Sequence, residues 1–185
     1  MTVHAPLMMT KEAFFAWIDQ REERYEYAKG RVVMMVRVTR NHAVVSGNLF
    51  AALKLRLNRN EYDVVSESFA VSVGDSVRFP DVLVQPRQSD GKALEAKAPI
   101  LIAEVLSPST LHVAFVDKRS EYLSLPSLEI YLIASPDEPR VWLWQRAAGE
   151  FPQDPEVIDE LDKQISLPAL GVEIPLAELY QGVSP

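Results

Sequence analysis

The chain has 185 residues, 48% of them hydrophobic and 24% charged, which is the composition of an ordinary globular protein. The absence of cysteine excludes disulfides, thiolate nucleophiles and zinc sites built on sulfur, and it fits a reducing compartment. The net charge of −7 excludes a broad basic surface for nucleic acid, although no acidic residue stands between Lys29 and Asn60.

The length predicts a single domain over residues 1–185. We expect its core to span about residues 10–145, followed by an acidic C-terminal extension over residues 146–185. No apolar run approaches the roughly 18 residues that a membrane helix needs, and the first residues do not resemble a signal peptide. We therefore expect a cytoplasmic protein without membrane contact.

The first third of the chain is expected to form a helix, a hairpin and a second helix. Thr10 can cap a helix whose aromatic residues recur at helical spacing. Two extended runs on either side of Gly30, residues 25–27 and 32–38, predict a β-hairpin. Residues 41–57 carry apolar side chains along one stripe and predict a second helix.

Four strands are predicted next, over residues 62–65, 69–73, 77–84 and 99–106. The third of these strands is interrupted by Pro80. The fourth is the most apolar and should lie in the centre of the sheet, because a strand buried on both faces is apolar throughout.

The last predicted elements are a helix and two strands. A turn over residues 107–110 ends in helix-capping residues, and the helix over residues 111–123 stops before Pro126. Strands are predicted over residues 128–134 and 140–145, with short strands in the acidic tail. This order predicts an α/β fold in which a mixed sheet is flanked by helices.

Two carboxylates lie on strands where a charge is costly to bury. Asp81 follows Pro80, and Glu104 stands inside the most apolar strand. Taken singly, Asp81 can be a turn residue and Glu104 a partner in an ion pair. On successive strands the two favour a joint site, and paired carboxylates suit Mg²⁺ or Mn²⁺.

Further candidates lie on the predicted hairpin and helices. Lys118 shares a helix face with Tyr122, which can direct its ammonium group toward the carboxylates, although a surface lysine is the commoner outcome. Glu26 is either a further ligand or the solvent-facing member of its strand. Arg40 and His42 open the second helix, where backbone N–H groups favour a phosphate, although His42 can also be a cap or a surface residue.

These residues resemble the motifs of the PD-(D/E)XK nuclease superfamily, and more closely those of its bacterial restriction endonuclease-like branch of unknown function. The resemblance extends from about Thr10 to Trp144. It is carried by residues 24–30, the helix that starts at Asn41-His42, Pro80-Asp81-Val82, residues 104–110, and Lys118 with Tyr122.

The resemblance implies a restriction endonuclease-like fold and Mg²⁺-dependent hydrolysis of DNA phosphodiester bonds. Asp81, Glu104 and the carbonyl of Val105 would hold the metal, and Glu26 would complete the site. The superfamily usually places a lysine two residues after the second acid, where this chain has Leu106. In this branch the lysine comes from the next helix, which implies that Lys118 assists the attacking water.

An acidic protein is expected to bind DNA weakly unless two copies combine their basic faces, so we also expect a homodimer. The alternative to a nuclease is a catalytically inactive binding module that keeps the nuclease fold. Three other chemistries lack support, because the chain has no Walker-type phosphate-binding loop, no dinucleotide fingerprint and no nucleophile-elbow serine. A hydrolase that processes sugars or nucleotides is a third alternative, and it would need a pocket that the sequence does not show.

Overall fold

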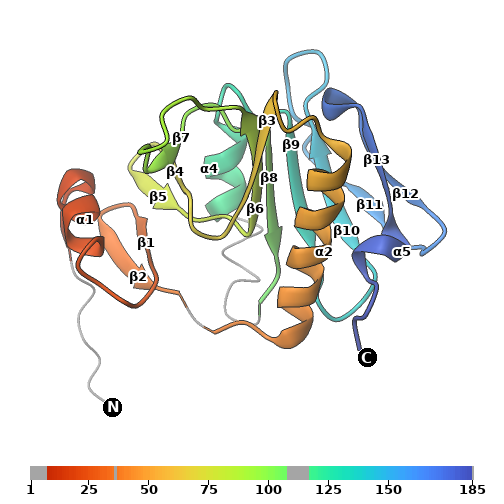
Figure 1. Ribbon diagram of the computed structural model, residues 1–185, viewed down its shortest axis with the longest axis horizontal. Coiled ribbons are helices and arrows are strands. Elements are labelled where there is room, and N and C mark those ends of the chain that lie inside the picture. Colours follow the sequence, from red (N-terminus) through yellow and green to blue (C-terminus); the bar gives the residue numbers. More distant parts are fainter. Residues whose placement is uncertain (1–7, 36, 108–116, 185) are drawn as a thin grey trace.

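The computed structural model describes residues 8–35, 37–107 and 117–184, and it contains two β-sheets and a C-terminal hairpin (Figure 1). The six-stranded sheet has the order β11-β10-β9-β8-β6-β3. Only β8 and β9 run parallel among its neighbouring pairs. Its strands are β3 (Tyr62–Ser66), β6 (Val82–Pro86), β8 (Leu101–Val105), β9 (Ile130–Ala134), β10 (Val141–Gln145) and β11 (Glu156–Ile158).

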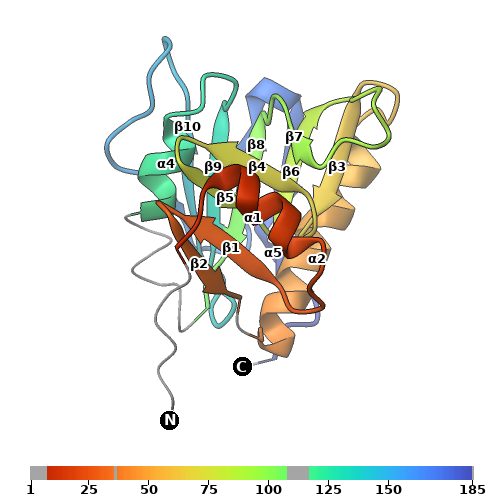
Figure 2. The same cartoon turned by 90° about the vertical axis from the view of Figure 1, so that its left-hand side faces the viewer.

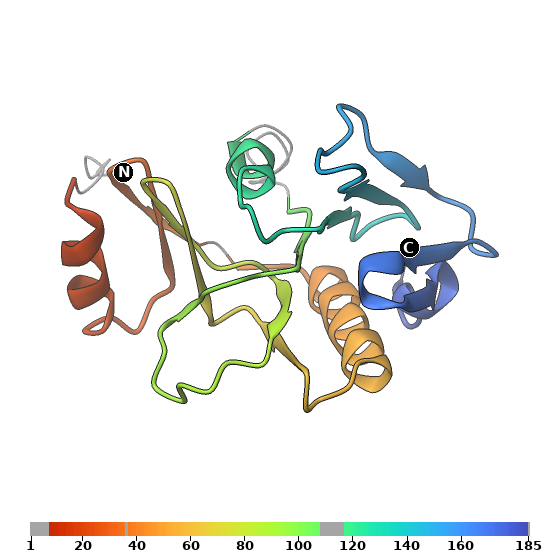
Figure 3. The same cartoon turned by 90° about the horizontal axis from the view of Figure 1, so that it is seen from above.

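Helices cover both faces of the six-stranded sheet, α2 (Arg40–Arg56) on one side and α4 (Arg119–Leu123) on the other (Figure 3). Leu49 and Leu53 of α2 pack in one buried cluster with Leu101 and Ala103 of β8. The alternation of the strand turns Ile102 to the opposite face, where it packs with Tyr122 and Tyr131. β8 is therefore buried throughout, as its apolar sequence predicts.

The five-stranded sheet has the order β2-β1-β5-β4-β7 and is covered by α1 (Lys11–Ile18), which crosses its outer face (Figure 2). The side chain of Thr10 accepts a hydrogen bond from the backbone of Ala13, which confirms the expected cap. Phe14 packs on Tyr27 with ring centroids 5.4 Å apart. The strands are β1 (Tyr25–Ala28), β2 (Arg31–Met34), β4 (Ala70–Val73), β5 (Ser76–Arg78) and β7 (Glu95–Ala96).

The prediction of a single strand over residues 77–84 is wrong. The run consists of β5 and β6, which belong to different sheets, and residues 79–81 cross from one sheet to the other. Pro80 cannot donate a ladder hydrogen bond, so the run breaks there. The crossing places Asp81 at the junction of the two sheets. Residues 111–116 of the helix predicted over residues 111–123, and residues 108–110 of the turn before it, lie outside the described residues.

The C-terminal region adds to the main core. It forms the hairpin β12 (Gln164–Leu167) and β13 (Val172–Pro175), linked by the 3₁₀ turn η2 (Pro168–Leu170) and followed by α5 (Leu176–Leu179). Its apolar side chains join the cluster beneath α2, and these are Ile165, Leu167, Ile174, Leu176 and Leu179. Arg56 of α2 also pairs with Glu178 at 2.6 Å.

This mixed arrangement of sheets and flanking helices confirms the predicted α/β fold class, a mixed sheet flanked by helices. Within the described residues, no helix combines the length and the apolar character that crossing a membrane requires.

Replacing Leu167 by alanine should lower the free energy of unfolding by about 2–5 kcal/mol, because its fully buried side chain would leave a cavity. The matched control is Leu161→Ala, since Leu161 is 51% exposed and its loss should change stability by about 0.5 kcal/mol or less. Urea unfolding of both variants measures the difference. Equal losses would show that the hairpin does not share the main core.

Candidate active site

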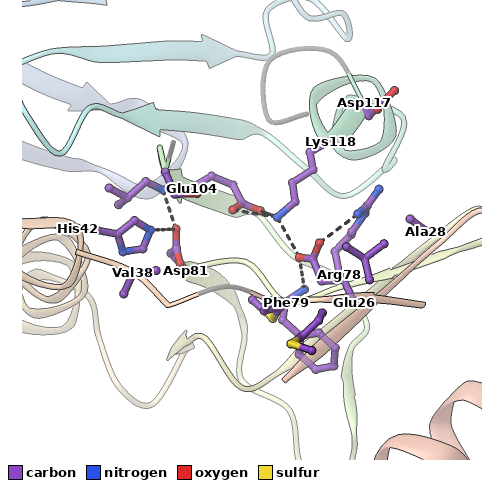
Figure 4. Close-up of a pocket in the computed structure, with 15 residues that line it drawn as sticks. Glu26, Ala28, Val38, His42, Arg78, Phe79, Asp81, Glu104, Asp117 and Lys118 are labelled. Carbon is purple, nitrogen blue, oxygen red and sulfur yellow. Dashed lines mark hydrogen bonds and ion pairs between the residues drawn. The ribbon is translucent and has the colours of Figure 1, made fainter. Parts of the chain in front are cut away.

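The predicted site residues meet in a cavity of about 420 Å³ at the junction of the two sheets (Figure 4). They arrive on β1, α2, the crossing segment 79–81, β8 and the turn before α4. Those that line the cavity are Glu26, His42, Asp81, Glu104, Val105 and Lys118. Arg40 does not line it; this exposed arginine donates a hydrogen bond to the carbonyl of Gly182 at 3.1 Å.

Lys118 is the centre of the buried part of the site. Its Nζ donates to Glu26 Oε1 at 2.9 Å and to both carboxylate oxygens of Glu104, at 3.1 and 3.2 Å. Tyr122, one helical turn further along, donates its hydroxyl to Glu104 Oε1 at 2.9 Å. Glu104 reaches this group because the alternation of β8 turns it to the face that α4 covers. Four side chains thus form one buried hydrogen-bonded group.

Burial and neighbouring charge set the protonation of this group. Burial raises the pKa of Glu104 to about 7, and the nearby Asp81 and Glu26 add to the rise while Lys118 opposes it. Burial acts to lower the pKa of Lys118, but Glu104 and Glu26 together hold it above its ordinary value. Burial also opposes ionisation of Glu26, yet Lys118 and Arg78 keep its pKa below the usual range. Lys118 is therefore a cation and Glu26 an anion at neutral pH.

Asp81 is fixed at the mouth of the site by two contacts to the same oxygen. Its Oδ2 accepts a hydrogen bond from the backbone N–H of Val105 at 2.7 Å and lies 3.3 Å from His42 Nε2. The adjacent pairing of Val82 with Ala103 brings Asp81 beside Glu104 at the same end of neighbouring strands. Burial acts to lower the pKa of His42, but the contact with Asp81 raises it above the ordinary value.

A second buried ion pair supports the first, and the sequence analysis missed it. Arg78 of β5 donates to Glu121 of α4 through Nε at 2.8 Å and Nη2 at 3.1 Å, and to Glu26 Oε2 through Nη1 at 3.1 Å. Ser76 also donates to Glu121, at 3.0 Å. Arg78 thus ties the five-stranded sheet to the helix behind Lys118. The available signals were a charge on an apolar strand and the i,i+3 spacing of Lys118 and Glu121.

The oxygen donors at this junction fit a hard divalent cation. Asp81 and Glu104 supply carboxylates from adjacent strands, and Val105 supplies a backbone carbonyl beside them. Mg²⁺ commonly uses one or two carboxylates and keeps several waters. No group of three or more His, Cys, Asp or Glu side chains suited to a metal occurs among residues 8–35, 37–107 and 117–184. The protein therefore offers two carboxylates, and waters or substrate would have to complete the coordination.

Replacing Arg78 by methionine should lower the free energy of unfolding by about 3–5 kcal/mol, because Glu121 and Glu26 would lose a buried charged partner. The matched control is Arg56→Met, which breaks the partly exposed pair with Glu178 and should cost about 1 kcal/mol or less. Denaturant unfolding compares the two. Equal costs would mean that the Arg78 pair contributes no more than a surface pair does.

The chain was compared with known proteins. Residues 11–177 match the model of the Uma2 family, which is described as "Putative restriction endonuclease". Two relatives come from Synechocystis sp. strain PCC 6803. Uncharacterized protein sll1609 is 26% identical over 138 residues, covering 72% of this chain and 78% of that protein. Uncharacterized protein slr1290 is 23% identical over 192 residues and covers 100% of both chains.

A solved structure shows the same fold. The crystal structure of a putative nuclease belonging to DUF820, from Anabaena variabilis ATCC 29413, superposes with a TM-score of 0.73 at 19% identity. The match covers 93% of this chain and 97% of the other. Because the family model spans most of the chain, this protein belongs to the Uma2 family, within the restriction endonuclease-like branch of the PD-(D/E)XK superfamily.

Proposed function

We propose that the protein is a divalent-metal-dependent nuclease that hydrolyses phosphodiester bonds in DNA. The observation that carries this proposal is the meeting of Glu26, Asp81, Glu104 and Lys118 in one cavity from four separate segments. Membership of a restriction endonuclease-like family supports the same class of reaction.

Asp81, Glu104 and the carbonyl of Val105 would hold the metal. When bound, a divalent cation supplies positive charge to the phosphate and lowers the pKa of a water molecule. Both oxygens of Glu104 contact Lys118 in the structure, so at least one of them would have to exchange its partner. Asp81 needs less rearrangement to bind a metal, because contacts with Val105 and His42 already fix the position of its carboxylate.

Lys118 would act as a hydrogen-bond donor and a fixed positive charge. Glu104 and Glu26 hold its pKa above the ordinary value, so it keeps its proton at neutral pH and is a poor general base. In that form it can orient the attacking water or stabilise negative charge on the phosphoryl group. Glu26 would position the ammonium group rather than react.

His42 and Arg40 would contribute differently. Nε2 of the buried His42 faces Asp81, which supports a role in orienting that carboxylate. A direct contact between His42 and DNA phosphate stays a prediction, as does the same contact for the exposed Arg40. Arg40 is the more accessible of the two and lies at the start of α2.

Glu104→Gln and Lys118→Met should each lower Mg²⁺-dependent DNA cleavage by at least about a hundredfold, because each removes a charge that the reaction uses. Matched controls are Glu156→Gln and Lys54→Met, which change the same residue types outside the cavity. Cleavage of plasmid and oligonucleotide DNA is the measurement, with thermal unfolding to confirm that each variant folds. Parental activity in Glu104→Gln would contradict the proposal.

One observation favours the alternative of a binding module without catalysis. Lys118 already occupies the space between Glu26 and Glu104 and balances part of their charge. A protein that has lost catalysis can keep such a group as a structural ion pair. The two functions differ in their response to metal, since a binding module gains no stability from Mg²⁺.

Mg²⁺ should raise the melting temperature, and the rise should grow from pH 6 to pH 8. Below about pH 7 a proton occupies the Glu104 carboxyl and competes with the cation, so affinity should increase by up to about tenfold per pH unit until the group is ionised. Thermal unfolding at a series of Mg²⁺ concentrations measures this. Glu104→Gln should remove both the rise and its pH dependence, and a parental protein that ignores Mg²⁺ at pH 8 would favour the binding module.

A further inference from the structure

One side of the cavity is apolar and open to solvent. We call this side the apolar wall, and its residues are Val33, Met34, Met35, Val38 and Phe79. Val33, Met34 and Val38 are 48%, 60% and 46% exposed, although they stand next to one another at the cavity. Exposed apolar side chains that gather at a pocket commonly mark a binding surface.

The apolar wall lies beside the charged groups of the site. Val33 of β2 pairs directly with Glu26 of β1, so the two side chains are neighbours on one face of the hairpin. The backbone N–H of Phe79 lies 3.5 Å from Glu26 Oε1, and Figure 4 shows Phe79 and Val38 below the carboxylates. The apolar wall and the reacting groups therefore line one continuous cavity.

The charged groups of the site lie deep in the cavity. Glu104 and Lys118 are only 6% and 4% exposed, and the cavity above them measures about 420 Å³. This volume can hold one nucleotide, so a nucleotide that has left the base stack can bring its phosphate to these groups and its base to the apolar wall.

Positive charges flank the apolar wall along the chain. Lys29, Arg31 and Arg37 are exposed, and none has an acidic partner within the described part of the chain. Arg31 pairs with Ala28, and strand alternation places it on the same face of the hairpin as Val33. Proteins that bind single strands combine positive charges that contact the backbone with aromatic side chains that contact the bases, and Phe79 is the aromatic member of this wall.

We propose that the apolar wall binds an unpaired nucleobase and that Arg31 contacts the backbone of the same strand. The preferred substrate is then single-stranded nucleic acid, or the unpaired part of a flap or loop. This inference rests on the proposed nuclease function for the site itself, and it adds the class of substrate.

The binding experiment uses a labelled single strand of about ten nucleotides, the size that one such groove covers. Ca²⁺ replaces Mg²⁺, and a gel confirms that the strand stays intact. The double variant Val33→Thr, Met34→Gln should weaken binding by at least about fivefold. In a second series, each strand lacks one base, at a different position in each strand. The parental protein should bind one of these strands more weakly, by the same factor of about five. At that position, binding of the abasic strand to the double variant should be no weaker than binding with either change alone, because both changes remove the same contact.

Arg31 is tested by salt dependence. Arg31→Gln should reduce the slope of log K against log salt by about 0.7, the value for one phosphate contact on a single strand. The matched controls are Leu55→Ser and Arg59→Gln. Leu55 is 82% exposed near the far end of α2, Arg59 follows that helix, and neither lines the cavity. Both controls should bind as the parent does, and an unchanged slope in Arg31→Gln would overturn the role given to this residue.

A cleavage experiment separates this inference from the proposed function. The parent should cut a single strand or a flap at least about tenfold faster than the same sequence in a duplex. Equal cutting of the duplex, or wall variants that bind normally, would overturn the inference and leave the nuclease intact. Base-dependent binding without cleavage of any substrate would overturn the nuclease and keep the base site. A dimer that the double variant dissociates would assign the wall to a second copy and overturn the base site.

Discussion

The ammonium group of Lys118, held between Glu26 and Glu104, is the interaction on which the site depends. It joins β1 of one sheet, β8 of the other and the turn before α4 that carries the lysine itself. Buried charges of this kind are stable only together, because removing one leaves the others without compensation in a medium of low polarity. The mutual position of the two sheets at the cavity is therefore coupled to the charge state of one amine.

The negative and positive charges around the junction of the two sheets do not balance. Glu26, Glu104, Asp81 and Glu121 provide four carboxylates around the junction, and the permanent cations that pair with them are Lys118 and Arg78. The raised pKa of Glu104 is one consequence, since burial and two neighbouring acids all disfavour its charge. A local excess of negative charge beside oxygen donors is the electrostatic condition under which a divalent cation is attracted.

The sequence predicts the residues whose chemistry is unusual for their surroundings. Asp81 and Glu104 stand in apolar strands, so their convergence with Lys118 could be expected from composition and motif. Arg78 and Glu121 look like ordinary charges on a strand and a helix, and only the packing of α4 against β5 pairs them. The break at Pro80 was visible, but a change of sheet is a tertiary event that a local pattern does not encode.

The C-terminal segment also shows that composition alone does not reveal which side chains pack in the core. Its acids dominate the composition, yet alternate residues such as Ile165 and Leu167 face inward and complete the core beneath α2. That support holds α2, and with it His42 and Asp81, while the opposite end of the site rests on β2, the terminal strand of the five-stranded sheet. Asp81 and Glu104 thus belong to the well-packed part of the molecule, and most of the apolar wall lies at its edge. Under the proposed function, this division would keep the reacting groups fixed while the apolar wall adapts to bases of different size.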